Sequence, residues 1–227
     1  MNIDLLIALL KSTLNCSVST RFLANEIRLP VRIVEKTLLS LAKNNLVTSI
    51  NRKEVKVSED QRLKLVIFTL KEGADVERVC RALGWKEFED LVALILEHNG
   101  YRVSKHFRFK APTRRYEIDV IGVEDPFVLS VECKHWKYSW RRAATIGAVK
   151  KQVERTKALA QYLPEPKDRL GIAKWEKTKY MPLVSTLSNT PLRVFDRVPV
   201  IPIFYLNSFL NDVQKHIDEL TILSTSL

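Results

Sequence analysis

The sequence predicts an α/β protein in which a mixed β-sheet is flanked by helices and follows a small helical domain. Three short helical patterns and a hairpin pattern fill residues 1–58. Two apolar, β-branched runs at 116–123 and 127–136 are separated by the turn signal "EDP", which predicts a β-hairpin. Amphipathic patterns at 85–98 and 143–163 predict helices on either side of that hairpin.

The composition favours a folded, basic protein with a polyanionic partner. Hydrophobic residues make up 46% of the chain, which excludes disorder as a description of the whole. Lys and Arg total 37 against 26 Asp and Glu, a net charge of +11. This excess favours nucleic acid over an anionic membrane, and a basic protein without such a partner is the alternative.

Cysteine usage and the N-terminus bear on location. Cys16, Cys80 and Cys133 have no paired spacing, so neither a zinc knuckle nor a disulfide framework is expected. The start "MNIDLLIALLKSTL" contains Asp4 and no basic segment, unlike a signal peptide. No apolar run approaches the roughly 18 residues that span a bilayer. We therefore expect a cytoplasmic protein, intracellular and nucleoid-associated.

The first 58 residues resemble a winged helix-turn-helix domain. Helices are expected at 3–14, at 21–27 after a Ser19 or Thr20 cap, and at 31–45 with Pro30 in the first turn. "LVTSI" and "VKVS", joined by "NRKE", would form the wing. The inward face of the third helix is expected to comprise Ile33, Val34, Thr37, Leu38 and Leu41.

The resemblance implies contact with DNA, because residues 1–70 hold eleven basic and six acidic residues. The third helix would present Arg32 and Lys36 to the major groove, and the wing would bring Arg52 and Lys53 near phosphates. A protein–protein module is the alternative. A helical connector, 59–84, would link this domain, 1–58, to a second domain, 85–227.

The helix at 85–98 carries a carboxylate at an unusual position. Glu87, Asp90 and Glu97 fall on its polar side. Glu89 lies at the edge of the apolar stripe, where a carboxylate is costly unless it has a partner. The alternative is a side chain that extends to water.

The hairpin places further carboxylates together. If Glu124 to Phe127 form the connection, Val123 pairs with Val128, and the same register puts Asp119 opposite Glu132. Like charges repel there, and Lys134 offsets only part of the charge. A divalent cation held by oxygen ligands, Mg²⁺ or Mn²⁺, would account for the rest.

Two neighbouring residues suggest other chemistry at first sight. Cys133 alternates with the charged positions and is expected to be a buried small hydrophobe rather than a nucleophile. His135 has no second His or Cys at ligand spacing, so a loop residue is favoured over a zinc ligand.

This ordered set resembles the PD-(D/E)xK nucleases of the restriction-endonuclease-like fold. The matching elements are Glu89 on a helix, "EID" ending at Asp119, and "ECK" from Glu132 to Lys134. A preceding winged helix resembles the layout of Mrr-like restriction enzymes. Many Mrr-like members carry Gln-x-Lys where this chain has Glu-x-Lys, and archaeal Holliday junction resolvases carry the Glu form, so the subfamily is open.

The resemblance implies roles for these residues. Asp119 and Glu132 would hold the metal, Glu89 would complete its shell, and Lys134 would act on the attacking water or stabilise the transition state. A Gln or Lys on the following helix assists related nucleases, which points to Gln152. Glu117 would either support the metal-binding residues from behind or lie at the rim of the site, and we favour the rim. Thr156 stands where an exonuclease-type pattern would have Tyr.

Residues 134–157 are strongly basic, with eight Lys or Arg and one acid. Interleaved aromatic residues, Trp136, Tyr138 and Trp140, suit either base stacking or packing on the domain. The cations expected to contact phosphates in this segment are Lys137, Arg141, Arg142, Lys150 and Lys151.

The C-terminal third predicts strands near 181–187 and 198–205 and a helix from Asn207 or Ser208. Pro199 and Pro202 indicate an edge strand or its ends. By analogy, exposed strand edges or the last helix would carry a homodimer interface.

The resemblance thus implies a Mg²⁺-dependent or Mn²⁺-dependent DNA endonuclease. The alternative is a DNA-binding regulator or structural protein on a nuclease fold that does not cut. An RNA-directed nuclease is a third, weaker possibility, and the sequence does not identify a protein partner.

Overall fold

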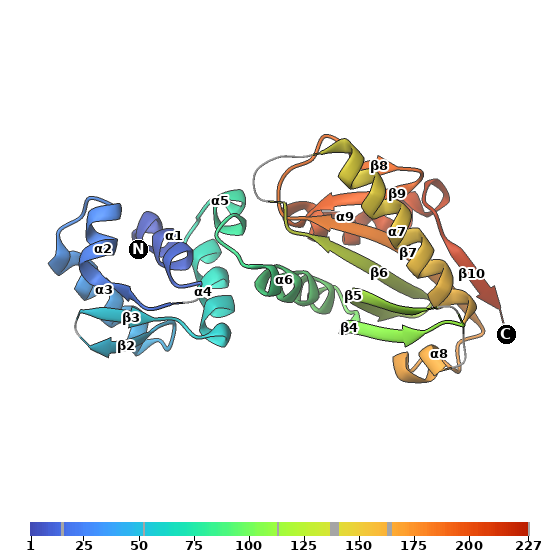
Figure 1. Cartoon of the computed structure of the whole chain (residues 1–227), viewed down its shortest axis with the longest axis horizontal. Coiled ribbons are helices and arrows are strands. Elements are labelled where there is room, and N and C mark those ends of the chain that lie inside the picture. Colours follow the sequence, from blue (N-terminus) through green and yellow to red (C-terminus); the bar gives the residue numbers. More distant parts are fainter. Residues whose placement is uncertain (15, 52, 113, 137–140, 163–164, 227) are drawn as a thin grey trace. The chain divides into compact units, whose positions relative to one another are not determined.

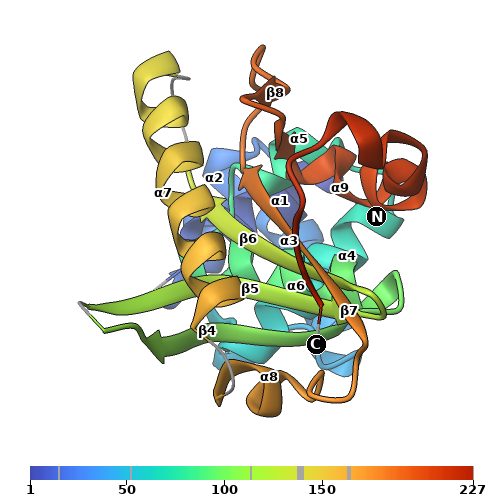
Figure 2. The same ribbon diagram turned by 90° about the vertical axis from the view of Figure 1, so that its right-hand side faces the viewer.

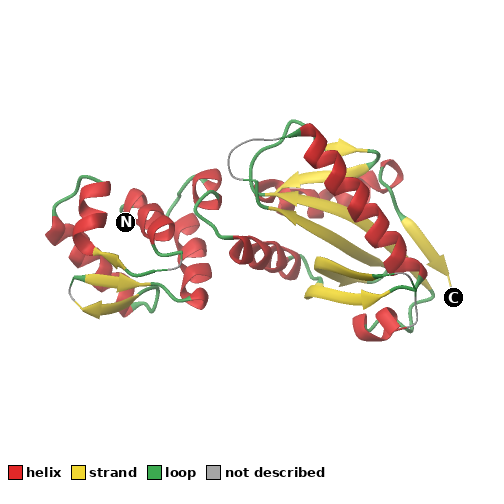
Figure 3. Cartoon of the chain, viewed as in Figure 1, coloured by secondary structure: helices red, strands yellow, loops and turns green. Residues whose placement is uncertain are grey.

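The chain divides into two compact units, Met1–Phe88 and Glu89–Leu227. The structure is a computed structural model and describes all residues except 15, 52, 113, 137–140, 163–164 and 227. No helix among the described residues is long and apolar enough to cross a membrane. Both units contain helices and strands (Figures 1 and 3).

The first unit contains short helices and a small antiparallel sheet of strand order β1-β3-β2. The elements are α1 (Ile3–Ser12), β1 (Val18–Ser19), α2 (Thr20–Glu26), α3 (Val31–Lys43), β2 (Thr48–Asn51), β3 (Glu54–Lys56), α4 (Glu59–Lys71) and α5 (Val76–Cys80). The expected helices and hairpin are therefore present in the expected order.

Local signals explain where these helices begin and end. The Ser19 hydroxyl accepts a hydrogen bond from the Phe22 amide (3.1 Å), and Ser58 forms a capping box with Gln61. Gly73, with φ +86°, follows the end of α4. Pro30 is the N-cap of α3 rather than a residue of its first turn, a correction of one position.

The buried face of α3 is narrower than predicted. Val34, Leu38 and Leu41 are buried, at the helical spacing of four and three residues. Ile33 was expected to face inward, but it is 49% exposed, and Leu39 is 57% exposed. Only one row of α3 contacts the core, so the residues beside that row face solvent together with Arg32 and Lys36.

Glu87 was predicted to lie on the polar side of its helix, and this was wrong. Its carboxylate is buried and pairs with Arg62, itself 2% exposed. The Arg62 guanidinium also donates to the Leu10 carbonyl (2.9 Å) and the Thr13 hydroxyl (2.9 Å). Because α4 supplies a buried cation, a position that looks polar in the sequence becomes part of the core.

The second unit is a mixed sheet of order β4-β5-β6-β7-β9-β8, with β10 also pairing β7. β6 and β9 pair with β7 in parallel, and the other pairs are antiparallel. Its strands are β4 (Arg102–Lys110), β5 (Arg115–Glu124), β6 (Phe127–Lys134), β7 (Lys177–Thr186), β8 (Val194–Phe195), β9 (Val198–Pro202) and β10 (Leu223–Ser226).

Helices flank this sheet as predicted. α6 (Trp85–His98) spans the boundary between the units, and its Leu96 side chain contacts the sheet at Gly122. α7 crosses one face of the sheet (Figure 2). The remaining helices are α7 (Arg142–Gln161), α8 (Glu165–Leu170), α9 (Ile203–Asp212) and the 3₁₀ segment η1 (Val213–Glu219).

The predicted hairpin register is confirmed as far as the pair Val120–Val131, and the expected pair Asp119–Glu132 lies one step beyond the paired residues. Glu124 pairs with Phe127 across the turn, and Val123 pairs with Val128. The register continues to the pair Val120–Val131. Antiparallel partners share a face, so this register brings the Asp119 and Glu132 positions to the same end of the hairpin.

The C-terminal elements differ in part from the prediction. The helix starts at Ile203 rather than at Asn207 or Ser208, because Pro202 ends β9 and serves as the N-cap of α9. β9 lies between β7 and β8 and so is not an edge strand. The short strands β8 and β10 carry too little periodicity to be identified in the sequence.

Candidate active site

Asp119 lies where the regular strand pairing is interrupted. The β4–β5 register omits the pair His106–Asp119, and His106 has a positive φ of 51°. Ile118 and Ile121 pack in one core cluster although strict alternation would put them on opposite faces. At this interruption Asp119 Oδ2 accepts a hydrogen bond from the Cys133 amide (2.8 Å), which joins the Asp119 carboxylate to β6.

The electrostatics of Asp119 place it near the other predicted carboxylates. Burial, and then the negative charge of Glu132, raise the pKa of Asp119 to about 6. Glu89 raises this pKa further, whereas the Cys133 amide and Lys134 lower it. Glu132, Glu89 and Lys134 therefore all act electrostatically on Asp119.

Glu132 is a buried carboxylate, 3% exposed, with a cation on each oxygen. Lys134 Nζ lies 2.5 Å from Oε1, and the Arg155 guanidinium of α7 pairs with Oε2. Sequence analysis missed Arg155. Arg155 stands three residues after Gln152, and this spacing, which puts both side chains on the same side of a helix, was the feature of the sequence that could have indicated it.

Gln152 is fully buried and binds the sheet. Its Nε2 donates to the Ser130 carbonyl (2.7 Å) and the Ser130 hydroxyl (2.8 Å). Its side-chain oxygen has no hydrogen-bond partner within the described part of the chain. In this structure Arg155, rather than Gln152, contacts Glu132 from α7, and a catalytic role of Gln152 stays a prediction.

Glu89 is also buried, at 2% exposed, and it has a partner that the sequence did not indicate. His106 Nε2 lies 3.5 Å from a Glu89 carboxylate oxygen, and His106 Nδ1 lies 3.5 Å from Glu117. Glu117 in turn accepts a hydrogen bond from Arg108 (2.8 Å), which is the main reason that its pKa is lowered. Glu117 is partly exposed, at the rim of the site.

Cys133 and His135 have the predicted settings. Cys133 is completely buried, and burial raises the pKa of its thiol well above the ordinary value, so the thiolate that a nucleophile needs is disfavoured. His135 lies in the loop after β6. Trp136 packs on the cluster of Ala148, Val149 and Val200, which favours packing over base stacking for this side chain.

The carboxylate oxygens of Asp119, Glu132 and Glu89 are the type of ligand that a hard divalent cation prefers, although they are not arranged as a complete metal site. Within the described ranges, no three His, Cys, Asp or Glu side chains form a group that could hold a metal ion. Mg²⁺ often takes one or two carboxylates and keeps several waters, so Asp119 and Glu132 are a sufficient donor pair in principle. Binding would require Glu132 to exchange a cationic partner for the metal.

Most of the predicted DNA-contacting cations are exposed. Arg52 and Lys137, with Tyr138 and Trp140, lie outside the described residues. The exposed ones are Arg32, Lys36, Lys53, Arg141, Arg142, Lys150 and Lys151. They are accessible to a large anionic partner, but exposure alone does not identify that partner.

Comparison with known families adds the class of the second unit. Residues 80–162 match the family model Mrr_cat, described as a restriction endonuclease. The matched segment contains Glu89, Asp119, Glu132, Lys134 and Gln152, and also Arg155. The mixed sheet with flanking helices fits the restriction-endonuclease-like fold. The match supports the PD-(D/E)xK nuclease superfamily, whose members generally use a divalent metal.

Three solved structures are similar over part of their length. A protein of unknown function, AF1548, is 17% identical, with 43% of this chain and 44% of that chain covered and a TM-score of 0.30. VC1899 from Vibrio cholerae is 14% identical, with 96% and 52% covered and a TM-score of 0.42. Can2 from Sulfobacillus thermosulfidooxidans, in complex with cyclic tetra-adenylate, is 10% identical, with 95% and 51% covered and a TM-score of 0.40.

The chain thus spans about half the length of these structures or less. The comparison with curated proteins gives no match.

Proposed function

We propose that this protein is a metal-dependent DNA endonuclease. The single observation that carries the proposal is the cluster around Asp119, where burial first, and then the charges of Glu132 and Glu89, raise the pKa of a carboxyl group that the Cys133 amide holds against β6. Carboxylates crowded in this way are expected where a cation is to be bound. The restriction-endonuclease match over residues 80–162 supports the same class.

In this proposal the chain's residues divide the work of phosphodiester hydrolysis. Asp119 and Glu132 would hold Mg²⁺ or Mn²⁺, with Glu89 completing the shell directly or through water. When bound, the cation would supply charge neutralisation at the phosphate and activation of water. Lys134 would orient the attacking water or stabilise negative charge as it develops. Gln152 would support the site from α7 by fixing the strand at Ser130.

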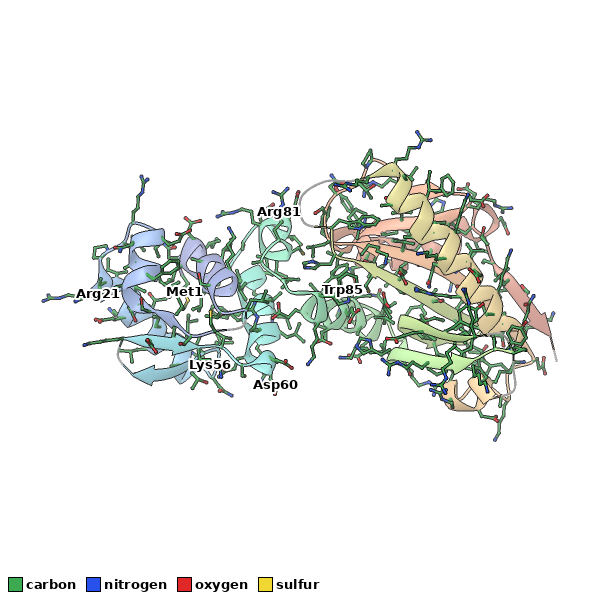
Figure 4. All side chains as sticks on the ribbon, in the orientation of Figure 1. Met1, Arg21, Lys56, Asp60, Arg81 and Trp85 are labelled. Carbon is green, nitrogen blue, oxygen red and sulfur yellow. The ribbon has the colours of Figure 1, made fainter. Side chains whose placement is uncertain are left out.

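The proposed division of labour is DNA docking by residues 1–58, a connector at 59–84 and hydrolysis by residues 85–227. The order of helices followed by the β2–β3 hairpin supports a winged helix in the first part. Its exposed cations include Arg32, Lys36 and Lys53, and the side chains of Arg21 and Lys56 also extend outward (Figure 4). A homodimer would suit cleavage of both strands of a duplex.

Site-directed cleavage assays test this function. Purified protein is incubated with plasmid, linear and branched DNA and with RNA, in the presence of Mg²⁺ or Mn²⁺. We expect DNA cleavage that Asp119→Ala abolishes and Lys134→Met reduces by about a hundredfold or more. Glu89→Gln should fail, whereas Glu97→Gln, an exposed carboxylate on the same helix, should cleave normally. Absence of cleavage by the wild type, or full cleavage by Asp119→Ala, rejects the proposal.

A second candidate is a DNA-binding protein that retains the nuclease fold without cutting. It is favoured by one observation, namely that both oxygens of Glu132 already have cationic partners, Lys134 and Arg155. Tight, salt-dependent binding of DNA without hydrolysis under any metal condition would support this candidate.

A further inference from the structure

The β4–β5 hairpin carries a basic hollow next to the candidate active site. Its volume is about 560 Å³, and the cations that line it are Arg108, Lys110, Arg115 and Arg169. The hollow contains one carboxylate, Glu117. Figure 2 shows β4 and β5 extending past the lower part of α7, on the left of the view. None of these cations was among the residues that the sequence pointed to.

Two of the cations are held in place by the fold. Arg108 donates to Glu117 (2.8 Å), and Arg169 of α8 donates to the Arg108 carbonyl (2.6 Å) while its guanidinium lies 4.4 Å from the centre of the Phe107 ring. Side chains fixed in this way lose little freedom when they bind an anion.

The other two cations are available to a ligand. Lys110 and Arg115 pair with each other across the strands and are exposed. In the part of the chain that the structure describes, no carboxylate forms an ion pair with either one. Two cations side by side repel, and a polyanion seated between them would relieve that repulsion.

Two aromatic residues, Phe109 and Tyr116, line the hollow, and their contacts indicate how a ligand would be bound. The Tyr116 ring stacks on Phe109, with centroids 5.4 Å apart and an interplanar angle of 17°. The Arg114 guanidinium lies 4.4 Å from the same ring. Since protein groups already occupy this ring, it does not offer a platform for an unstacked base. Recognition in the hollow therefore depends on charge, which suits phosphates rather than bases.

The hollow is continuous with the candidate site. Arg115 and Glu117 occupy alternate positions of β5, before the irregularity at Asp119, and both line the hollow. Glu117 also connects, through His106, to the buried Glu89. Arg115 is four residues from Asp119, about 13 Å along a strand, which corresponds to about four base pairs of duplex at 3.4 Å each.

We propose that this hollow binds the phosphate backbone of duplex DNA a few base pairs from the phosphate presented to Asp119. The proposal deepens the function proposed above and rests on it for the position of the reacting phosphate. A duplex presents its phosphates outward and keeps its bases stacked, which fits a hollow with fixed cations and a Tyr116 ring already in contact with Phe109 and Arg114.

The test compares two double charge reversals in the full-length chain. Lys110→Glu/Arg115→Glu changes the hollow. The control, Lys174→Glu/Lys177→Glu, makes the same charge change at exposed residues. Lys179 pairs with Phe127, the first residue of β6, so Lys177 lies beyond the end of β6 that is opposite to Lys134. Binding to a labelled duplex of about 20 base pairs is measured by anisotropy without metal, over a range of salt concentrations.

We expect the hollow variant to bind at least about tenfold more weakly, with the slope of log affinity against log salt reduced by about two. The control variant should change both quantities much less. Equal losses in the two variants, or unchanged binding by the hollow variant, overturn the proposal. A loss restricted to single-stranded DNA also overturns it, because it contradicts the duplex assignment.

Since no metal is present, binding is separated from hydrolysis. If the wild type never cleaves DNA but the hollow variant binds DNA more weakly, the phosphate-binding role of the hollow is upheld and the endonuclease activity is rejected. If the wild type cleaves DNA and the hollow variant binds DNA normally, only the role of the hollow is rejected. Thermal unfolding of both variants establishes that they fold, which is expected because the four substituted residues are exposed.

Discussion

The guanidinium of Arg155 pairs with the carboxylate of Glu132 and connects α7 to β6 at the candidate active site. Lys134 binds the other oxygen of the same carboxylate. Glu132 is the residue proposed to bind a divalent cation, so a metal and Arg155 would compete for it. This competition gives Arg155 a role in setting metal affinity that can be measured apart from cleavage.

Arg155→Met is expected to tighten Mn²⁺ binding by roughly threefold to tenfold, because Glu132 is released from a competing positive charge. Isothermal titration of the purified variant with Mn²⁺ measures this change. Lys150→Met, on the exposed side of α7, is the control and should bind Mn²⁺ as the wild type does. Weaker binding by Arg155→Met would mean that Arg155 orients Glu132 for the metal instead.

Asp119→Asn is expected to stabilise the metal-free protein at neutral pH. Because the pKa of Asp119 in the folded state is raised to about 6, Asp119 ionises at a lower pH in the unfolded chain than in the folded protein. The wild type therefore loses stability as the pH rises from about 4 to about 6. The full shift corresponds to about 3 kcal/mol, and solvent screening at this partly exposed group reduces it to roughly 1–2 kcal/mol.

Denaturant unfolding at about pH 4 and about pH 7.5 measures the effect of Asp119→Asn. The stabilisation of the variant should be much larger at the higher pH, because at about pH 4 the aspartate is protonated in the folded state and only partly ionised in the unfolded chain. An equal difference at both pH values would contradict the role of Asp119 ionisation.

The buried pair Arg62–Glu87 is expected to hold the first unit together. Arg62→Met leaves Glu87 buried without its cation and should cost about 3–5 kcal/mol. Adding Glu87→Gln should recover part of that loss, which a double-mutant cycle detects as coupling. The exposed pair Lys86–Glu59 is the matched control, where loss of the pair should cost less than about 1 kcal/mol. Similar costs at the two pairs would contradict the prediction.

The exposed face of α3 is expected to contact DNA. Arg32→Ala/Lys36→Ala should weaken duplex binding about tenfold at moderate salt and reduce the salt slope by about two. Lys64→Ala/Lys71→Ala removes the same charge from exposed positions of α4 and serves as the control. If Arg32→Ala/Lys36→Ala left DNA binding unchanged, whereas Ile33→Ser or Leu39→Ser weakened association with another protein, the first unit would be a protein–protein module instead.

Much of this organisation could be predicted from local patterns. The helix carrying Glu89, the turn between β5 and β6 and the pair Val123–Val128 follow from periodicity and turn residues. A hairpin register, once its turn is known, extends by counting, which is why the positions of Asp119 and Glu132 could be brought together without a structure.

Contacts between segments distant in the chain were not predictable in this way. Glu87 has the sequence setting of a solvent-exposed carboxylate, and only the packing of α4 shows that Arg62 buries it. Likewise, Ile33 has an apolar side chain at a plausible spacing but lies outside the row of α3 that contacts the core.

The sequence by itself determined the order of the elements, their charge and the ordered acids that resemble a nuclease motif. Only the tertiary structure decided which basic side chain each acid meets: Arg155 at Glu132 and His106 at Glu89. It also decided that Arg108 and Arg169 meet in a basic hollow beside the site. The physical reason is that helix and strand patterns are set by residues close together in the sequence, whereas ion pairs form between residues of separate elements and depend on how those elements pack.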